Sequence, residues 1–183
     1  MGLRGRSNLV DEQFFFVTTT VIEHANVFAE DKYCDILIDQ LKRWQVHFQF
    51  AILGYVIMPS HFHWIVRLEL KCGTISDIMR EIKVHAAWAI TDELERDGRK
   101  ELCALFEGSG KRFEDQRRQF WMKRFDDQVI RNQRMFMAKL LYIHNNPVKA
   151  GLVERAEQYK YSSARNYIND DHSIIYVDTS YAG

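Results

Sequence analysis

Two histidines, one residue apart, lie inside an apolar stretch of the chain. His61 and His63 flank Phe62, and residues 54–58 and 64–66 on either side are apolar. In a β-strand, side chains at i and i+2 share a face, so both imidazoles project to one side while Phe62 points to the other. Two neutral imidazoles so placed can bind one metal ion. The alternative is a pair of edge-strand histidines that make ordinary hydrogen bonds, and a motif this short does not decide between the two.

A tyrosine and an asparagine lie one helical turn apart, far downstream of the histidines. Tyr142 and Asn146 precede Pro147, and residues four apart on a helix share a face. The tyrosine hydroxyl, whose pKa is about 10 when unperturbed, becomes a nucleophile if a nearby cation stabilises its phenolate. The side-chain carbonyl oxygen of Asn146 is an acceptable ligand for Mg²⁺ or Mn²⁺. The alternative is a tyrosine that only packs at the edge of the core, followed by an Asn-Pro helix stop.

Together these segments resemble a known family. Residues 54–63 (GYVIMPSHFH) and 142–153 (YIHNNPVKAGLV) are similar to the REP-associated tyrosine transposases, a branch of the single-tyrosine HUH transposases. The likeness runs from Phe14 to Tyr167 and includes residues 14–18, 120–131 and 161–167. The combination of the NPVKAGLV run with the histidine pair is the most specific part of the resemblance.

The resemblance implies a role for each of these residues. His61 and His63 match the metal ligands of the family, Tyr142 matches the attacking tyrosine, and Asn146 falls where a third polar metal ligand is expected. The implied activity is a metal-dependent transesterification that uses Mg²⁺ or Mn²⁺. It cleaves and rejoins single-stranded DNA next to hairpins, such as repetitive extragenic palindromes, through a 5′-phosphotyrosine intermediate. The protein would act as a monomer or a homodimer.

Three basic residues are candidate DNA contacts. Arg4 and Arg6 lie on a basic N-terminal arm, and Lys139 precedes Tyr142 by three residues. Arginine and lysine side chains hold single strands through their phosphates. Each residue also has a simpler interpretation, which is a disordered tail for the arginines and a solvated charge for the lysine.

Two other functions fit some of the same residues. The first is a non-catalytic, domesticated protein that binds DNA hairpins on the same scaffold, since a fold does not fix a function. The second is a zinc hydrolase that uses His61, His63 and a distant ligand such as Cys72 or His85, although a third ligand with sensible spacing does not stand out. A covalent protein–DNA product would distinguish the transesterase from the non-catalytic hairpin-binding protein. Tightly bound stoichiometric zinc would favour the zinc hydrolase.

The elements that position these residues follow from hydrophobic periodicity and turn chemistry. Strands are expected at residues 13–21, 48–58, 61–70 and 120–130, and helices at 31–44, 74–96, 132–146 and 162–168. Thr74 and Asp77 form a candidate capping box, Asn132 a candidate N-cap, and Pro147 a stop. We expect residues 99–119 to form a polar, flexible loop. The order predicts an α+β protein with a ferredoxin-like or RRM-like antiparallel sheet, helices packed on one face, the other face available, and a C-terminal helix that bears the tyrosine.

Composition limits the class of protein. The 183 residues suit one domain spanning residues 1–183, and 25 Lys+Arg balance 25 Asp+Glu. This neutrality disfavours a protein that coats nucleic acid, but it allows a local basic groove. The three cysteines are widely spaced and predict neither a disulfide framework nor a cysteine-rich zinc site. Without a run of about 20 apolar residues we expect no membrane span and a cytoplasmic protein.

Overall fold

Four strands form one antiparallel sheet in the computed structural model, which describes residues 13–110 and 118–182. Their spatial order is β2-β3-β1-β4, and their bounds are β1 Phe14–Thr20, β2 Ala51–Met58, β3 His61–Arg67 and β4 Asp126–Val129. Helix α1 (Asp31–Phe48) follows β1, and α2 (Ile75–Arg96) follows β3. This is the predicted α+β, ferredoxin-like arrangement.

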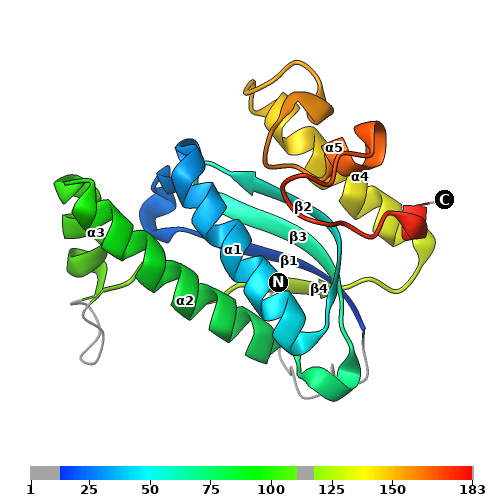
Figure 1. The fold of residues 1–183 in the computed structure, drawn as a ribbon, viewed down its shortest axis with the longest axis horizontal. Helices are drawn as coiled ribbons and strands as arrows, with labels where there is room; N and C mark the ends of the chain where they lie inside the picture. The colour runs from blue at the N-terminus through cyan, green and yellow to red at the C-terminus, as the bar shows by residue number, and fades with distance from the viewer. Residues whose placement is uncertain (1–12, 111–117, 183) are drawn as a thin grey trace.

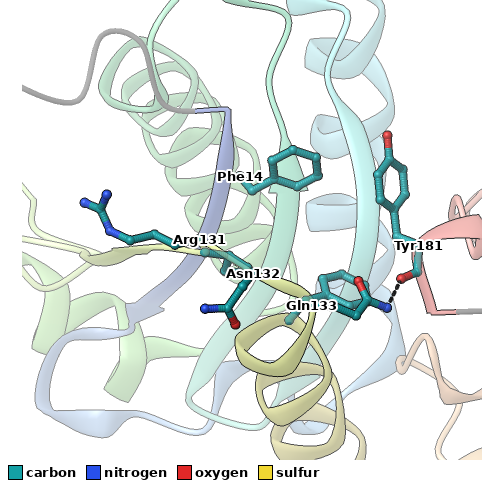
Figure 2. Close-up of a pocket in the computed structure, with 7 residues that line it drawn as sticks. Phe14, Arg131, Asn132, Gln133 and Tyr181 are labelled. Atoms are coloured by element: carbon teal, nitrogen blue, oxygen red, sulfur yellow. Dashed lines mark hydrogen bonds between the residues drawn. The ribbon is translucent and has the colours of Figure 1, made fainter.

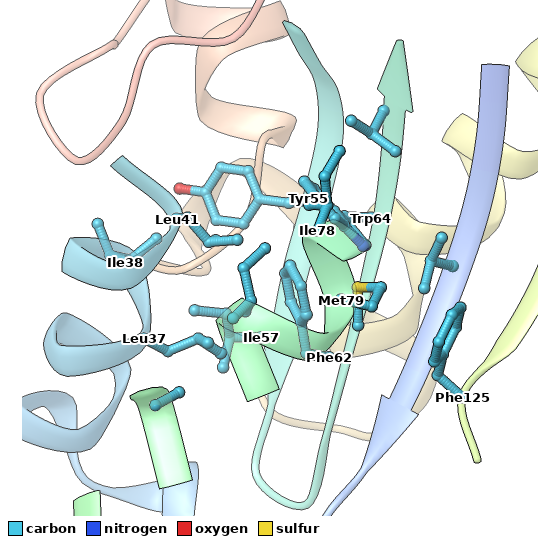
Figure 3. Packing of buried hydrophobic residues seen from close by; sticks show 14 of the residues in the cluster. Leu37, Ile38, Leu41, Tyr55, Ile57, Phe62, Trp64, Ile78, Met79 and Phe125 are labelled. Carbon is cyan, nitrogen blue, oxygen red and sulfur yellow. The ribbon is translucent and has the colours of Figure 1, made fainter. Parts of the chain in front are cut away.

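Helices α1 and α2 cover one face of the sheet and enclose the larger part of the core (Figure 1). Alternation along β3 sends Phe62 and Trp64 to this face, where they meet apolar residues of both helices such as Leu37 and Met79 (Figure 3). The predicted capping box at the start of α2 is confirmed, because the Thr74 hydroxyl accepts a hydrogen bond from the Asp77 amide while the Asp77 carboxylate accepts one from the Thr74 amide. Capping satisfies amide groups that the helix itself leaves unpaired.

The opposite face of the sheet is not available, contrary to the expectation from the sequence. Helix α4 (Gln133–Lys149) packs across β2 and β3 on that face (Figure 1). Its apolar stripe forms a second core with alternate residues of the strands, and the buried members of this core are Phe16, Leu53, Val56, Met58, Ile65, Ile130, Phe136, Leu140 and Ile143. Both faces of the sheet are therefore covered by helices, and α4 lies over β2 and β3 on the face that carries the histidines.

Two other expectations were wrong. Residues 100–110 form a helix, α3 (Lys100–Gly110), rather than part of a flexible loop. Leu102, Leu105 and Phe106 recur at helical spacing, and Phe106 is fully buried in the main core. Helix α4 also continues through Pro147, because a proline in the last turn removes only one hydrogen bond. The helix ends at Lys149 and is followed by a Schellman motif, in which Gly151 has a positive φ and the Leu152 amide donates to the Pro147 carbonyl.

The C-terminal part of the chain covers the outer edge of β2. The Ile57 amide donates to the Tyr161 carbonyl at 3.0 Å, and the Ser163 amide donates to the Tyr55 carbonyl at 2.9 Å. An exposed strand edge presents unpaired amide and carbonyl groups, which these contacts satisfy. The remaining helical segments are α5 (Ala164–Asn169) and the short turns η2 (Ile22–His24), η3 (Val27–Ala29), η4 (Leu70–Cys72), η5 (Ala156–Gln158) and η6 (Ser180–Ala182).

No helix within residues 13–110 and 118–182 is long and apolar enough to cross a lipid bilayer.

Gly54 permits the close approach of α4 to β2. A Cβ at this position would lie 2.8 Å from Leu140 Cδ1 and 3.0 Å from Ile143 Cδ1. Both neighbours are buried, so they have little room to move. We expect Gly54→Ala to lower the free energy of unfolding by about 1–3 kcal/mol, measured by urea denaturation.

Gly108→Ala is the matched control, because a Cβ there has no atom within 4 Å and the residue lies inside α3. This control should raise the free energy of unfolding by about 0.5–1 kcal/mol. Equal stabilisation by both substitutions would contradict the close packing of α4 on β2.

Candidate active site

Strand β3 places the two histidines side by side on the face that α4 covers. The centroids of the His61 and His63 rings are 4.7 Å apart, and the ring planes cross at 78°. His63 is 5% exposed, whereas His61, at the first position of the strand, is partly open to solvent. The His63 imidazole is therefore buried, and the His61 imidazole is partly exposed.

Thr18 holds His63, and sequence reasoning missed it. The antiparallel register sets Thr18 of β1 opposite His63, and the Thr18 hydroxyl lies 2.7 Å from His63 Nδ1. With the ring proton on Nδ1, this nitrogen donates to the hydroxyl and leaves a lone pair on Nε2. His61 has a weaker partner in Ser60, whose hydroxyl lies 3.2 Å from His61 Nδ1. Such contacts fix ring orientation in histidines that bind metals.

Burial keeps both imidazoles neutral. It lowers the pKa of His63 to about 3, with smaller effects from the neighbouring charges of His61 and Lys139. It also lowers the pKa of His61, to which His24 contributes. Neutral imidazole is the form that binds metals. Among the described residues, His63 Nε2 is buried and has no hydrogen-bond partner, a costly situation for a polar atom unless something binds it.

Helix α4 brings Tyr142 to the same place. The ring centroids of Tyr142 and His63 are 5.4 Å apart, with the planes at 73°. Phe16 of β1 packs beside both rings, at 5.7 Å from His63 and 6.0 Å from Tyr142. Tyr142 remains 42% exposed, so a substrate can reach it. The tyrosine and the histidine pair, about eighty residues apart in sequence, therefore meet on one face of the sheet.

Two other predicted site residues lie on the same helix. Asn146 follows Tyr142 by one turn, and in the described part of the chain its amide nitrogen is buried without a hydrogen-bond partner. Lys139 Nζ lies 4.5 Å from the centroid of the Phe16 ring. Its positive charge is near enough to His63 to lower the pKa of that ring. Lys139 therefore brings a cation to the face that carries Tyr142.

A buried hydrogen bond fixes the height of α4 above the sheet. His144 Nε2 lies 2.8 Å from the Ser163 hydroxyl, and the hydroxyl oxygen accepts a hydrogen bond from the Tyr55 amide at 2.9 Å. Ser163 precedes α5 directly, so this contact ties the helix that bears the tyrosine to β2. Sequence reasoning did not single out either residue, because neither forms a local motif.

Some candidate residues lie elsewhere or outside the described chain. Arg4 and Arg6 belong to residues 1–12, which the structure does not describe. Arg118, at the end of the polar segment 99–119, pairs with Glu95 and Glu107. His85, a candidate zinc ligand, lies on α2 across the sheet from His61 and contacts Trp44. Within the described ranges, no group of three His, Cys, Asp or Glu side chains is arranged to hold a metal ion. The zinc hydrolase therefore lacks its ligand set there.

Two proteins that are similar to this chain in sequence are named as REP-associated tyrosine transposases. No protein-family model matches the chain. A Haemophilus influenzae protein named as a REP-associated tyrosine transposase is 24% identical over 149 residues, which cover 81% of this chain and 78% of that protein. A REP-associated tyrosine transposase of Escherichia coli K12 is 27% identical over 114 residues, which cover 62% of this chain and 54% of that relative.

A solved structure has the same fold. It shows a REP-associated tyrosine transposase bound to a REP hairpin and superposes with a TM-score of 0.65 at 20% sequence identity. The superposition covers 92% of this chain and 88% of that chain. The four-stranded antiparallel sheet and the helices on both of its faces are thus shared with that protein.

The buried hydrogen bond of His144 gives a pH dependence that can be measured. Burial lowers the pKa of His144 to about 4 in the folded chain, against about 6.5 when unfolded. The unfolded chain therefore takes up the proton first as the pH falls. Stability contributed by this group is complete above pH 6.5 and is lost as the pH falls towards 4. Relative to His144→Gln, the unaltered chain should lose up to about 1.4 kcal/mol of unfolding free energy per pH unit in this window.

Urea unfolding at several pH values with a chelator present measures this difference. Glutamine can keep a hydrogen bond to Ser163 but does not titrate, and all other groups are common to the two proteins. Parallel stability curves for the two proteins between pH 6.5 and 4 would show that His144 is not held neutral by burial.

Proposed function

We propose that this chain, which is homologous to the REP-associated tyrosine transposases in sequence and fold, is a metal-dependent transesterase of single-stranded DNA. The observation that carries the proposal is the contact between Tyr142 and His63 at 5.4 Å between ring centroids, beside a His63 Nε2 that is buried and lacks a partner among the described residues. A phenol next to a neutral, unsatisfied imidazole suits nucleophilic attack beside a bound cation.

The donor set fits a divalent metal ion. His61 and His63 would bind it through ring nitrogens, and Asn146 through its side-chain oxygen, which leaves positions open for substrate and water. The Asn146 oxygen and water suit Mn²⁺ or Mg²⁺, whereas the two imidazole nitrogens favour a transition-metal ion, so we expect Mn²⁺ to bind more tightly than Mg²⁺. A metal ion would satisfy His63 Nε2, and Thr18 supports the ring from the other side. When bound, the ion supplies Lewis-acid polarisation of the scissile phosphate.

Tyr142 supplies the nucleophile in this proposal. Its hydroxyl oxygen attacks the phosphorus of a phosphodiester in line, and the bond from phosphorus to the 3′ oxygen breaks. The phenol gives up its proton, the 3′ oxygen gains one, and the 5′ end of one fragment stays attached to Tyr142. The new ester retains the bond energy, so a later 3′-hydroxyl can reverse the step and rejoin strands. Lys139 places a positive charge on this face, where it holds a phosphate.

The substrate would be single-stranded DNA next to a hairpin, such as a repetitive palindromic element. The relative of known structure is bound to a REP hairpin, and the shared fold supports hairpin binding here. Both histidines and Tyr142 come from one chain, which supports catalysis by a monomer. A homodimer would contain two complete sets of these side chains.

Tyr142→Phe tests the nucleophile. The unaltered chain, incubated with a labelled single-stranded hairpin and Mn²⁺, should form a covalent protein–DNA product that survives denaturing electrophoresis. Tyr142→Phe should form none, because the attacking oxygen is absent, while its affinity for the hairpin stays within about twofold. Tyr176→Phe is the matched control, since Tyr176 is 65% exposed and its ring stacks on His172 in the C-terminal segment, and it should form the product normally.

A covalent product from Tyr142→Phe would mean that the nucleophile is another residue. Hairpin binding by the unaltered chain without any covalent product would instead indicate the non-catalytic hairpin-binding protein.

Calorimetric titration with Mn²⁺ tests the metal site independently of activity. His63→Ala should abolish the binding, and Thr18→Val should weaken it by about 10–100-fold, because valine keeps the shape of the side chain but cannot hydrogen-bond to His63 Nδ1. His47→Ala, at an exposed position of α1, is the control and should bind Mn²⁺ like the unaltered chain. Unchanged binding by His63→Ala would place the metal elsewhere.

A further inference from the structure

A cavity of about 200 Å³ opens on the face of the sheet that carries Tyr142. It lies between the start of β1, the residues after β4, the first turn of α4 and the C-terminal turn η6 (Figure 2). Its walls are mainly aromatic, formed by Phe14, Phe136 and Tyr181, and its polar rim consists of Arg131, Asn132 and Gln133. Pockets for drug-sized ligands have about 300–1,000 Å³. The cavity therefore suits a single flat ring system.

The aromatic wall is held in place by contacts on several sides. The rings of Phe14 and Tyr181 meet edge to face, with centroids 5.5 Å apart. Gln133 Nε2 donates a hydrogen bond to the backbone carbonyl of Tyr181 at 2.6 Å, which fixes η6 against α4 (Figure 2). The Arg67 guanidinium lies 5.8 Å from the centroid of the Tyr181 ring. These contacts hold the Tyr181 side chain in place as one wall of the cavity.

The polar rim offers a donor and an acceptor. Asn132 Oδ1 accepts the Met135 amide as the cap of α4, so the Asn132 amide N–H groups are the donors that it can direct to a ligand. Gln133 Nε2 is used by Tyr181, so its Oε1 can accept. Gln133 Oε1 can therefore accept a hydrogen bond from the edge of a nucleobase, and Gln is a residue that reads base edges.

The cavity lies close to the proposed catalytic residues. Phe14 and Phe16 are two residues apart on β1, so their side chains share a face about 7 Å apart, and Phe16 contacts both His63 and Tyr142. Phe136 precedes Tyr142 by six residues, or about 9 Å along the axis of α4. A strand held with its phosphate at Tyr142 would place a neighbouring base within reach of the cavity.

We propose that this cavity binds one unpaired nucleobase of the single strand that flanks the scissile phosphate. The base inserts against the aromatic wall and bonds to Gln133 Oε1 through its edge. Aromatic side chains bind splayed bases in this way in many proteins that recognise single strands. The cavity would then select which position of the strand comes to Tyr142. This inference rests on the proposed function, because it assumes a single-stranded DNA substrate.

Photocrosslinking of the unaltered chain locates the base directly. The probe is a DNA hairpin with randomised four-nucleotide flanks on both sides, in which one flank position at a time carries 5-iododeoxyuridine. Irradiation should link one flank position to a peptide that contains Tyr181 or Phe14. Crosslinks confined to peptides outside the cavity would overturn the proposal.

Binding measurements then test what Tyr181 contributes. By fluorescence anisotropy, Tyr181→Ala should bind the hairpin with randomised flanks about 5–150-fold more weakly, which is the loss expected for one stacked base. It should bind a hairpin with abasic flanks as the unaltered chain does. Tyr181→Phe should keep full affinity, because the ring remains, and Tyr176→Ala is the control on the same C-terminal segment. Full affinity of Tyr181→Ala for the randomised flanks would overturn the proposal.

The two proposals fail in different ways. A crosslink in the cavity without any covalent product at Tyr142 would count against the transesterase and leave base binding in place. A covalent product at Tyr142 with crosslinks only outside the cavity would count against base binding and leave the transesterase in place.

Discussion

The arrangement of the site depends on how closely α4 packs against β2. Gly54 lets Leu140 and Ile143 approach the strand to a distance that any side chain would prevent. The His144–Ser163 hydrogen bond acts at the same contact, because Ser163 Oγ lies 3.5 Å from the position of a Cβ on Gly54. Tyr142 is carried on α4, so both contacts control its position over the histidines. A shift of one ångström between helix and strand would separate the phenol from His63, a displacement that matters greatly in catalysis.

The second constraint is the environment of His63. Burial makes this ring a poor base, with a pKa of about 3, but leaves it a good metal ligand, because the neutral form carries the lone pair. Thr18 orients the ring, and Phe16 and Tyr142 surround it. Among the described residues, its Nε2 has no partner. The protein thus sustains a desolvated polar atom next to an exposed tyrosine.

Local patterns predicted much of this structure. Alternation along residues 61–63 and helical spacing in residues 142–146 assigned each side chain to its face, and the order of the elements predicted the sheet. The cavity at Phe14 and Tyr181, the Thr18–His63 pair and the His144–Ser163 bond were not predicted, because each joins segments whose register only the folded sheet defines. The stop expected at Pro147 was wrong, since Gly151 supplies the conformation that ends the helix. Helix α3 was missed because its polar flanks masked Leu102, Leu105 and Phe106.

The C-terminal segment that pairs with β2 has a consequence for self-association. Residues 161 and 163 already occupy the hydrogen-bonding groups of this border strand, and the border strand on the other side of the sheet, β4, spans only Asp126–Val129. Two copies of the chain therefore cannot merge their sheets through β2 into one continuous ribbon. A covered strand edge removes a template for edge-to-edge aggregation.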